Sequence, residues 1–243
     1  MSTVLQHYAN HLGPIYLWMA GGFERAIEVG RSDLKALDVP IRPGMTALDL
    51  GAGFGMHAVP LAQAGCSVTA VDSSEILLRE LQQHSEGLSI RVAEGDLLDF
   101  RRHIQGPQSL VLCMGDTLTH IQSQDEVTHL FKEVSKVLAP DGVFAMTYRN
   151  YSRPATGTGR FILVRSDDSR IHTCLLEEGP THMDVSDIIH ERSADAWRME
   201  VSSYKKLRLA PEWVLRALRE AGMTPEASPG PRGMIQVVAR LSR

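Results

Sequence analysis

The chain has 243 residues, of which 43% are hydrophobic and 22% charged, and its formal net charge is -4. This composition is typical of a globular protein with one main core, and it lacks the basic excess that supports non-specific nucleic-acid binding. The cysteines at positions 66, 113 and 174 are odd in number and have no zinc-site spacing. We therefore expect free thiols, no metal site and no nucleic-acid partner.

The N-terminal segment, residues 1–43, contains the apolar stretch LGPIYLWMAGGF at residues 12–23. This stretch is too short to cross a bilayer, and no positively charged region precedes it as in a signal peptide. We therefore expect a cytoplasmic protein with no membrane partner. An aromatic segment of this kind can fold over a bound ligand as a lid. We predict a helical lid over residues 1–43, with ligand contacts from Tyr16, Trp18 and Met19.

The next segment, residues 44–152, alternates short apolar runs with longer amphipathic ones. Hydrophobic periodicity and capping signals predict strands at 46–51, 67–72, 88–96, 109–116 and 142–150, and helices at 56–65, 74–85 and 124–138. Strands separated by helices of this length indicate a parallel sheet, which binds ligands beyond the carboxyl ends of its strands. The residues just after each strand are therefore the first candidates for a site.

Residues 153–209 change to an apolar period of two, with turn signals at DDS and EEGP. This pattern predicts an inserted antiparallel β segment, which we expect to cap the substrate over the carboxyl edge of the core sheet. Residues 210–243 then supply a helix at 211–222 and a closing strand at 233–241, which complete the core. The Pro/Gly-rich segment 224–233 is predicted to be a loop.

The sequence LDLGAGFG at residues 48–55 places three glycines at alternate positions directly after a strand. A dinucleotide fingerprint needs its third glycine where Met56 stands, which argues against NAD, and no Gly-Lys-Ser/Thr follows to make a phosphate-binding Walker loop. A loop with so few side chains lets a bulky cofactor lie against the backbone. The predicted contacts are Gly51, Ala52, Gly53 and Gly55.

Three acidic residues lie in or directly after the first three predicted strands of this segment. Asp49 is placed to accept hydrogen bonds from an ammonium group, and Asp72 to bind both hydroxyls of a ribose. Asp96 is placed to accept from an adenine amino group while the next backbone amide donates to the ring. A structural role, as a helix cap or an ion-pair partner, is the alternative for each. The predicted cofactor contacts are completed by Ser73, Leu97, Met114 and Gly115.

Taken together, five motifs between residues 48 and 150 resemble the class I S-adenosylmethionine-dependent methyltransferases: LDLGAGFG, VTAVDSS, EGDLLDF, LVLCMGDTLTHI and LAPDGVFAMTYRN. The resemblance implies S-adenosyl-L-methionine as the cofactor. It also implies an α/β fold with a Rossmann-like, doubly wound, mostly parallel sheet of seven strands, whose last strand lies antiparallel between its neighbours. In-line transfer of a methyl group from a sulfonium depends mainly on positioning, so no catalytic triad is expected.

A narrower resemblance concerns CMGDTLTHI followed by MTYRNYS, which are similar to stretches of the glycine N-methyltransferases. In that subgroup the corresponding arginine holds the substrate carboxylate, which implies the same role for Arg149. Asp116, which replaces an asparagine of the subgroup, and His120 follow the fourth strand and form a predicted base or orienting pair. These three residues are the predicted catalytic set. A structural alternative is that Arg149 pairs with Asp184 or Glu191 in the insert.

The leading hypothesis is therefore N-methylation of a small amine or amino-acid-like acceptor. We expect the protein to be a monomer or a homodimer, with this small-molecule methyl acceptor as its partner. Three alternatives stay open: a small-molecule O-methyltransferase, a cofactor-binding sensor without turnover, and a nicotinamide-dependent oxidoreductase. Nucleic-acid and protein substrates are disfavoured by the acidic net charge and by a covering insert that leaves room for a small acceptor.

Overall fold

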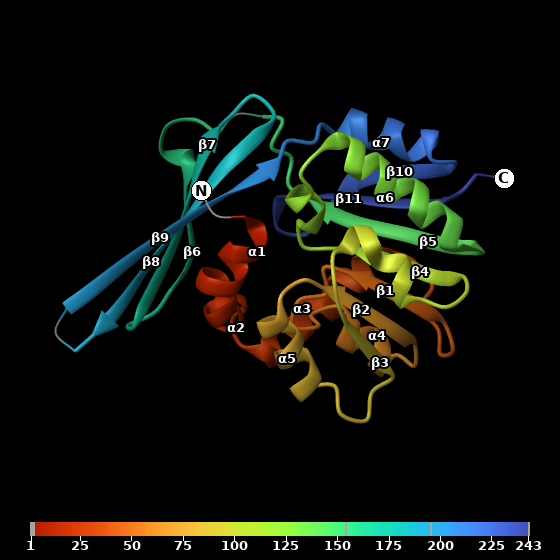
Figure 1. Ribbon diagram of the computed structural model, residues 1–243, viewed down its shortest axis with the longest axis horizontal. Coiled ribbons are helices and arrows are strands. Elements are labelled where there is room, and N and C mark those ends of the chain that lie inside the picture. Colours follow the sequence, from red (N-terminus) through yellow and green to blue (C-terminus); the bar gives the residue numbers. More distant parts are fainter. Residues whose placement is uncertain (1–2, 154, 195, 243) are drawn as a thin grey trace.

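The fold is taken from a computed structural model, which describes residues 3–153, 155–194 and 196–242. A seven-stranded sheet forms the core, and a four-stranded sheet stands beside it (Figure 1). The strand order of the core sheet is β10-β11-β5-β4-β1-β2-β3. Its strands are β1 (Thr46–Leu50), β2 (Ser67–Asp72), β3 (Ile90–Glu94), β4 (Gln108–Cys113), β5 (Leu138–Tyr148), β10 (Met223–Pro229) and β11 (Ile235–Leu241).

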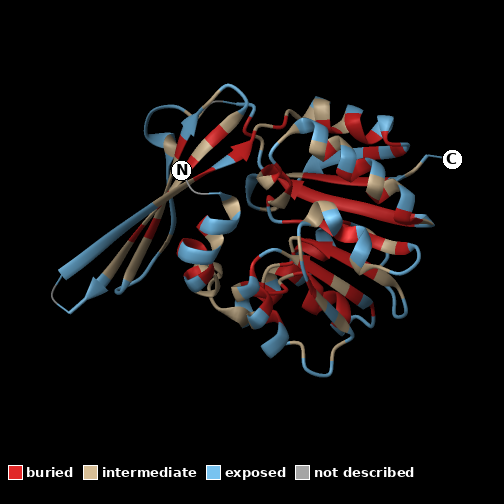
Figure 2. Cartoon of the chain, viewed as in Figure 1, coloured by how far each residue is buried: buried red, intermediate tan, exposed pale blue. Residues whose placement is uncertain are grey.

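The pairing of these strands confirms the predicted sheet. β1 to β5 pair in parallel, and β11 is antiparallel to both of its neighbours, β5 and β10. The central strands are buried almost along their length, as expected where helices cover both faces (Figure 2). One apolar cluster lies under α3 (Phe23–Ala36), α4 (Ala58–Gln63) and α5 (Glu75–Gln83). The other lies under η3 (Leu97–His103), α6 (Gln124–Val137) and α7 (Pro211–Glu220).

The helix boundaries follow local capping chemistry. The Ser74 hydroxyl accepts from the backbone amide of Leu77 at the start of α5, and Ser123 accepts from the amide of Glu126 at the start of α6. These bonds satisfy amides that have no partner inside the helix. Pro211 begins α7, where its missing N–H costs no hydrogen bond. The helices predicted at 74–85 and 124–138 are therefore confirmed within two residues at each end.

The predicted loop at residues 224–233 is wrong over most of its length. Residues 223–229 form β10, which pairs with β11 from Met223↔Leu241 to Pro229↔Ile235. The error came from reading Pro225 and Pro229 as strand breakers. β10 is the edge of the sheet and hydrogen-bonds on one side, so proline is tolerated there.

The insert forms a separate antiparallel meander, as the period of two predicted. Its strands, in sheet order, are β6 (Phe161–Ser166), β7 (Arg170–Glu178), β8 (His182–Ser193) and β9 (Ala196–Leu207). The DDS turn joins β6 to β7, with the Asp167 carboxylate accepting from the amides of Ser169 and Arg170. Burial alternates along β8, so one face of this sheet is covered and the other is not (Figure 2).

The N-terminal segment is helical, as predicted, but its first half is broken into short pieces. These are α1 (Val4–His7), the π-helical turn η1 (Tyr8–Leu12), the 3-10 turn η2 (Gly13–Ile15) and α2 (Tyr16–Ala20). They lie between the insert sheet and the core, where Leu12 and Ile15 pack against Ile189 of β8 (Figure 1). Within the described residues, no helix is both long and apolar enough to cross a membrane.

Candidate active site

A cavity of about 870 Å³ opens where the core strands end. Its volume falls in the range of small-molecule sites, roughly 300–1,000 Å³. The wall combines the loop after β1, the ends of β2 and β3, the turn after β4 and the first helices of the chain. Of the predicted site residues it contains Tyr16, Gly51, Gly53, Asp72, Ser73, Asp96, Leu97, Gly115 and His120. The parallel topology thus brings together residues that are far apart in the sequence.

The glycine loop is shaped by close contacts. Gly51 has a φ of 72°, and a Cβ there would lie 2.3 Å from Cγ2 of Thr117. Gly53 donates its backbone N–H to Oδ2 of Asp72 at 2.8 Å, which fixes the loop against the end of β2. Gly55 does not line the cavity, and a Cβ there would lie 2.4 Å from Cδ1 of Leu81. Gly51 and Gly53 therefore provide the backbone cradle, whereas Gly55 permits the packing of α5.

The carboxylates of Asp72 and Asp96 organise the two adjoining strand ends. Asp72 also accepts from the amide of Ser74 at 2.8 Å, and Asp96 caps η3 by accepting from the amide of Leu98 at 2.8 Å. Burial raises the pKa of Asp72, and its amide hydrogen bonds oppose that shift. A carboxylate offers about four acceptor sites, so these structural bonds leave capacity toward the cavity.

Asp49, which is predicted to bind a ligand ammonium group, does not line the cavity. Its side chain is 1% exposed and lies outside the residues that line the cavity, as do Ala52 and Met114. Its Oδ2 atom has no hydrogen-bond partner within the described part of the chain. Burial raises the pKa of Asp49 to about 6, although His57 and the Ala58 amide oppose the shift. The carboxylate therefore lies behind the glycine loop as a buried charge.

This buried charge makes the stability of the unliganded protein depend on pH. The pKa of Asp49 is higher in the folded than in the unfolded chain, so between about pH 4 and pH 6 the folded state binds the extra proton. The free energy of unfolding is then lower above pH 6, and it rises as the pH falls from about 6 to about 4. A shift of this size corresponds to about 3 kcal/mol.

We expect Asp49→Asn to remove this rise in the free energy of unfolding at acidic pH. Urea unfolding at pH 7 and pH 5, with the exposed Asp99→Asn as the matched control, measures the effect. If the pH dependence of Asp49→Asn matched that of the control, Asp49 would not be the titrating group.

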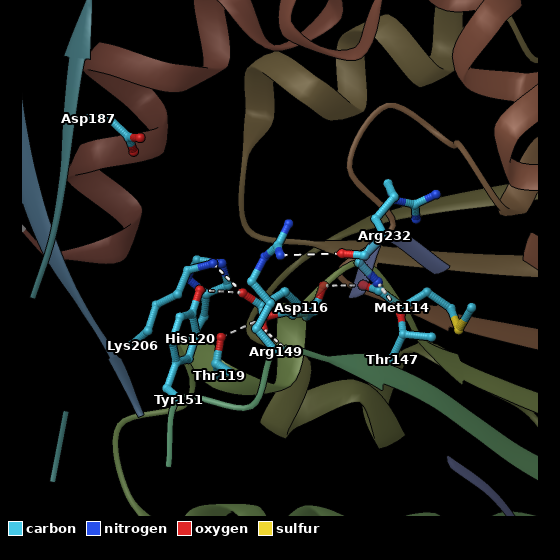
Figure 3. A network of polar contacts seen from close by, with 12 residues as sticks. Met114, Asp116, Thr119, His120, Thr147, Arg149, Tyr151, Asp187, Lys206 and Arg232 are labelled. Atoms are coloured by element: carbon cyan, nitrogen blue, oxygen red, sulfur yellow. Dashed lines mark hydrogen bonds and ion pairs between the residues drawn. The ribbon is translucent and has the colours of Figure 1, made fainter. Parts of the chain in front are cut away.

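Asp116 lies at the centre of a buried polar network rather than on the cavity wall (Figure 3). Its Oδ1 accepts from the amide of Arg149 at 2.8 Å, and its Oδ2 accepts from the Tyr151 hydroxyl at 3.1 Å and from Nζ of Lys206 at 2.5 Å. Burial favours a higher pKa for Asp116, but the Lys206 ammonium and the Arg149 amide outweigh it and lower the pKa.

A fully paired carboxylate with a lowered pKa is a poor proton acceptor, which favours a structural role for Asp116 over the predicted role as a base. Its φ of 76° turns the chain after β4, and its carbonyl accepts from the amide of Thr119 at 3.2 Å. Asp116 thereby fixes the turn that places Gly115 and His120 in the wall.

His120 lies on the cavity wall, where its ring is parallel to that of Tyr204, with 12° between the planes and 5.6 Å between centroids. Its Nε2 lies 3.4 Å from the Tyr8 hydroxyl, and its Nδ1 has no partner among the described residues. Burial, assisted by the Lys206 charge, lowers the pKa of His120 to about 3. The imidazole is therefore neutral at pH 7 and can orient a ligand through a hydrogen bond.

Tyr8 and Tyr16 form the lid side of the cavity, with their ring centroids 5.8 Å apart. Tyr16 also lies 5.9 Å from the ring of Phe54 in the glycine loop. Burial raises the pKa of both phenols, so both are neutral donors at pH 7. The prediction of an aromatic lid therefore applies to these two residues.

Trp18 and Met19 do not line the cavity. The Trp18 indole donates to Asp167 in the turn of the insert, and the Arg170 guanidinium lies 4.9 Å from its ring. Met19 packs on the apolar cluster around Ile189. Both attach the lid to the insert, because the aromatic segment is helical and presents its other face to β7 and β8. Their cofactor contact stays a prediction.

Arg149 is exposed, and its Nη1 donates to the Arg232 carbonyl at 3.5 Å (Figure 3). The alternative pairing with the insert does not form, since Asp184 bonds to Lys205 and Glu191 to Arg170. No carboxylate of the described chain forms an ion pair with this guanidinium. Arg149 is also outside the residues that line the cavity, so its role as a carboxylate anchor stays a prediction.

Three residues in or next to the site were missed at the level of sequence: Tyr8 and Thr117, which line the cavity, and Lys206, which pairs with Asp116 behind it. Tyr8 belongs to the same aromatic segment as Tyr16, and Thr117 is in the motif that supplied Gly115. Lys206 lies two positions after Tyr204 on β9, and side chains two positions apart on a strand point to the same face, so both lie on the covered face of the insert. That alternation was the available signal for a buried lysine.

Comparison with known proteins identifies the core. Residues 47–142 match the sequence profile of the family described as methyltransferase domain. The glycine/sarcosine N-methyltransferase of Aphanothece halophytica is 33% identical over 106 residues, which are 43% of this chain and 40% of that protein. The ubiquinone biosynthesis O-methyltransferase of Caulobacter vibrioides is 29% identical over 109 residues, 44% of this chain and 42% of that protein. The chain thus spans less than half the length of these relatives.

The whole fold has solved counterparts. The structure of CalS10 with bound S-adenosylmethionine, an amino pentose methyltransferase from Micromonospora echinaspora, aligns with a TM-score of 0.75 and 17% identity over 94% of this chain and 96% of that one. At this identity the likeness concerns the fold. Residues 47–142 thus match a methyltransferase domain, and the chain shares its fold with an S-adenosylmethionine-bound methyltransferase.

Proposed function

We propose that the protein transfers a methyl group from S-adenosylmethionine to the nitrogen of a small amine or amino-acid-like acceptor. The observation that carries the proposal is one continuous cavity, which extends from the glycine loop to the neutral side chains of His120, Tyr8 and Tyr16. Relatives that match the core include both N- and O-methyltransferases, so the choice of nitrogen rests on the chemistry of this wall.

The residues present fit the cofactor. Gly51 and Gly53 offer backbone without side chains, and the Cβ position of Gly115 has no atom within 4 Å. Asp72 would accept from the ribose hydroxyls, and Asp96 with the amide of Leu97 would hold the adenine. When bound, the cofactor supplies an electrophilic methyl group on a sulfonium.

The protein's own contribution is to orient the acceptor and exclude water. Tyr8 and Tyr16 close the lid side, and His120, whose Nε2 lies 3.4 Å from the Tyr8 hydroxyl, can accept or donate one hydrogen bond beside them. Holding a nucleophile in line with the methyl group can lower the barrier by about 7–11 kcal/mol. A neutral amine attacks without a base and loses its proton afterwards.

O-methylation is the second possibility, and the low pKa of His120 favours N-methylation over it. A hydroxyl acceptor benefits from a general base whose pKa lies near the working pH. Burial lowers the pKa of His120 to about 3, which makes it a weak base at pH 7. Asp116 is no substitute, because Lys206 occupies its carboxylate.

Calorimetric titration with S-adenosylmethionine, followed by transfer of labelled methyl to panels of small amines and phenols, tests the proposal. We expect binding and labelled amine products. Binding with no labelled product from a metabolite extract would instead indicate a sensor, and labelled phenols alone would indicate O-methylation. Absence of binding at millimolar cofactor would contradict the proposal.

The variant Asp72→Asn tests the ribose contact. Because a hydrogen bond to a charged group contributes about 1.5–3 kcal/mol, we expect the cofactor Kd to rise roughly ten- to hundredfold. Titration calorimetry measures the change, and Asp99→Asn serves as the control of equal charge. An unchanged Kd for Asp72→Asn would show that Asp72 only supports the glycine loop.

A further inference from the structure

The insert sheet has one face that no described segment of the chain covers. Its other face packs on the N-terminal helices and holds buried His172, Asp187, Ile189 and Tyr204. Strand registers assign to the uncovered face three rows across the sheet: Phe161, Leu175, Ser186 and Ser203; then Leu163, Thr173, Ile188 and Val201; then Ile171, His190 and Met199. We call these residues the outer face. None of them is buried (Figure 2).

The composition of the outer face is unlike that of a solvated sheet. An antiparallel sheet with one face in water normally presents polar side chains there. Here Leu163 is 63% exposed, Met199 60% and Val201 53%. Next to this face, toward the tip of the hairpin, Trp197 is 47% exposed. Exposed apolar side chains gathered in this way mark an interaction site.

Charge is confined to the ends of the outer face. The three rows contain no Asp, Glu, Lys or Arg. The ion pair between Asp184 and Lys205 borders the face at its base, with 2.7 Å between Nζ and Oδ1, and Arg192 borders it opposite Trp197 at the tip. An apolar centre with a polar rim is the usual anatomy of a protein interface.

We infer that the outer face binds the outer face of a second copy of this chain, which gives a two-fold symmetric dimer. Identical faces without central charge meet with no like-charge repulsion, and a two-fold axis makes such a contact self-complementary. Two sheets commonly pack face to face with interdigitated side chains. Four strands spaced by about 4.8 Å, the longest with 12 residues, span up to roughly 700 Å². Specific interfaces bury about 600–1,000 Å² from each partner, so the whole face lies within that range.

None of the residues of the outer face lines the proposed active site, although Lys205 at the base of the face does. Tyr8 and His120 lie on the covered side of the insert sheet, across the sheet from the outer face. Dimer formation and methyl transfer are therefore separate properties that separate experiments test.

Sedimentation velocity at micromolar concentration tests the inference on the full chain. We expect the wild type at twice the 26.8 kDa mass of the chain and Val201→Glu at the monomer mass. Ile162→Glu places the same charge on the opposite face of β6 and is expected to stay dimeric. Circular dichroism and the Tm verify that both variants are folded.

Three outcomes would overturn the inference. They are a monomeric wild type, a dimeric and folded Val201→Glu, and a dimer that Ile162→Glu disrupts to the same extent. A monomeric wild type would assign the outer face to a different partner. Met199→Glu provides a second variant in the next row, so a folding failure of Val201→Glu leaves the test intact.

Discussion

Replacement of Lys206 by methionine is expected to destabilise the protein by about 3–5 kcal/mol. The substitution removes the ammonium that pairs with Asp116, and the carboxylate stays buried with the Arg149 amide and the Tyr151 hydroxyl as its partners. A buried charge without its counter-ion bears the full cost of desolvation. Methionine keeps the length and apolar stem of lysine, so packing changes little.

Urea unfolding at pH 7 measures this loss. The matched control is Lys205→Met, the neighbouring lysine, whose ion pair with Asp184 is partly exposed. An exposed pair contributes about 0–1 kcal/mol, so the control should stay close to the wild type. The double variant Lys206→Met/Asp116→Asn should recover part of the loss. A loss below about 1 kcal/mol for Lys206→Met would contradict the role of the pair.

The difference between wild type and Lys206→Met should also depend on pH. The pKa of Asp116 is lowered in the folded chain, mainly by Lys206 against the opposing effect of burial. The stabilisation is therefore present above the pKa of an unfolded aspartate, about 4, and is lost as the pH falls through the lower folded value. Unfolding curves of the two proteins should converge at acidic pH.

Replacement of Gly30 by alanine is expected to destabilise the protein by at least about 2 kcal/mol and to weaken cofactor binding. Gly30 lies on the buried side of α3, where a Cβ would come 1.8 Å from the carbonyl oxygen of Met56. Alanine favours a helix by about 1 kcal/mol over glycine, but a clash with backbone cannot be relieved by a rotamer change. Either α3 or the end of the glycine loop must move.

Ser32→Ala, at an exposed position of the same helix, controls for helix propensity and should be close to neutral. Thermal unfolding and calorimetric titration with S-adenosylmethionine measure the two effects. A Gly30→Ala protein as stable as the control, with unchanged cofactor affinity, would show that α3 can shift without disturbing the loop.

The elements of the core were predictable because their signals are local. Alternation of apolar runs with amphipathic segments located β1 to β5, and serine caps located α5 and α6. β10 was missed because proline is a local signal, whereas tolerance of proline depends on an edge position that only the assembled sheet defines. The period of two likewise predicted the insert strands but not what each of their faces would contact.

The site residues also divide into those with a local sequence signal and those that depend on distant contacts. Those that follow a strand directly, such as Gly51, Asp72 and Asp96, were found because parallel topology brings strand ends to one edge. Asp116 was assigned to catalysis because its place in the motif is visible in the sequence, whereas its partner Lys206 lies 90 positions away. Trp18 was assigned to the lid because its aromatic character is visible, whereas the direction of its side chain is not.

The sequence by itself determined the class of fold, the position of the cofactor loop and the edge of the sheet where chemistry is possible, since backbone propensity and hydrophobic period act over short distances. Tertiary structure decided which carboxylates reach the cavity and which are neutralised behind it. Burial and the distance to a charged partner set that choice, and both depend on contacts between segments far apart in the chain. The same holds for the outer face, whose exposure follows from where the N-terminal helices pack.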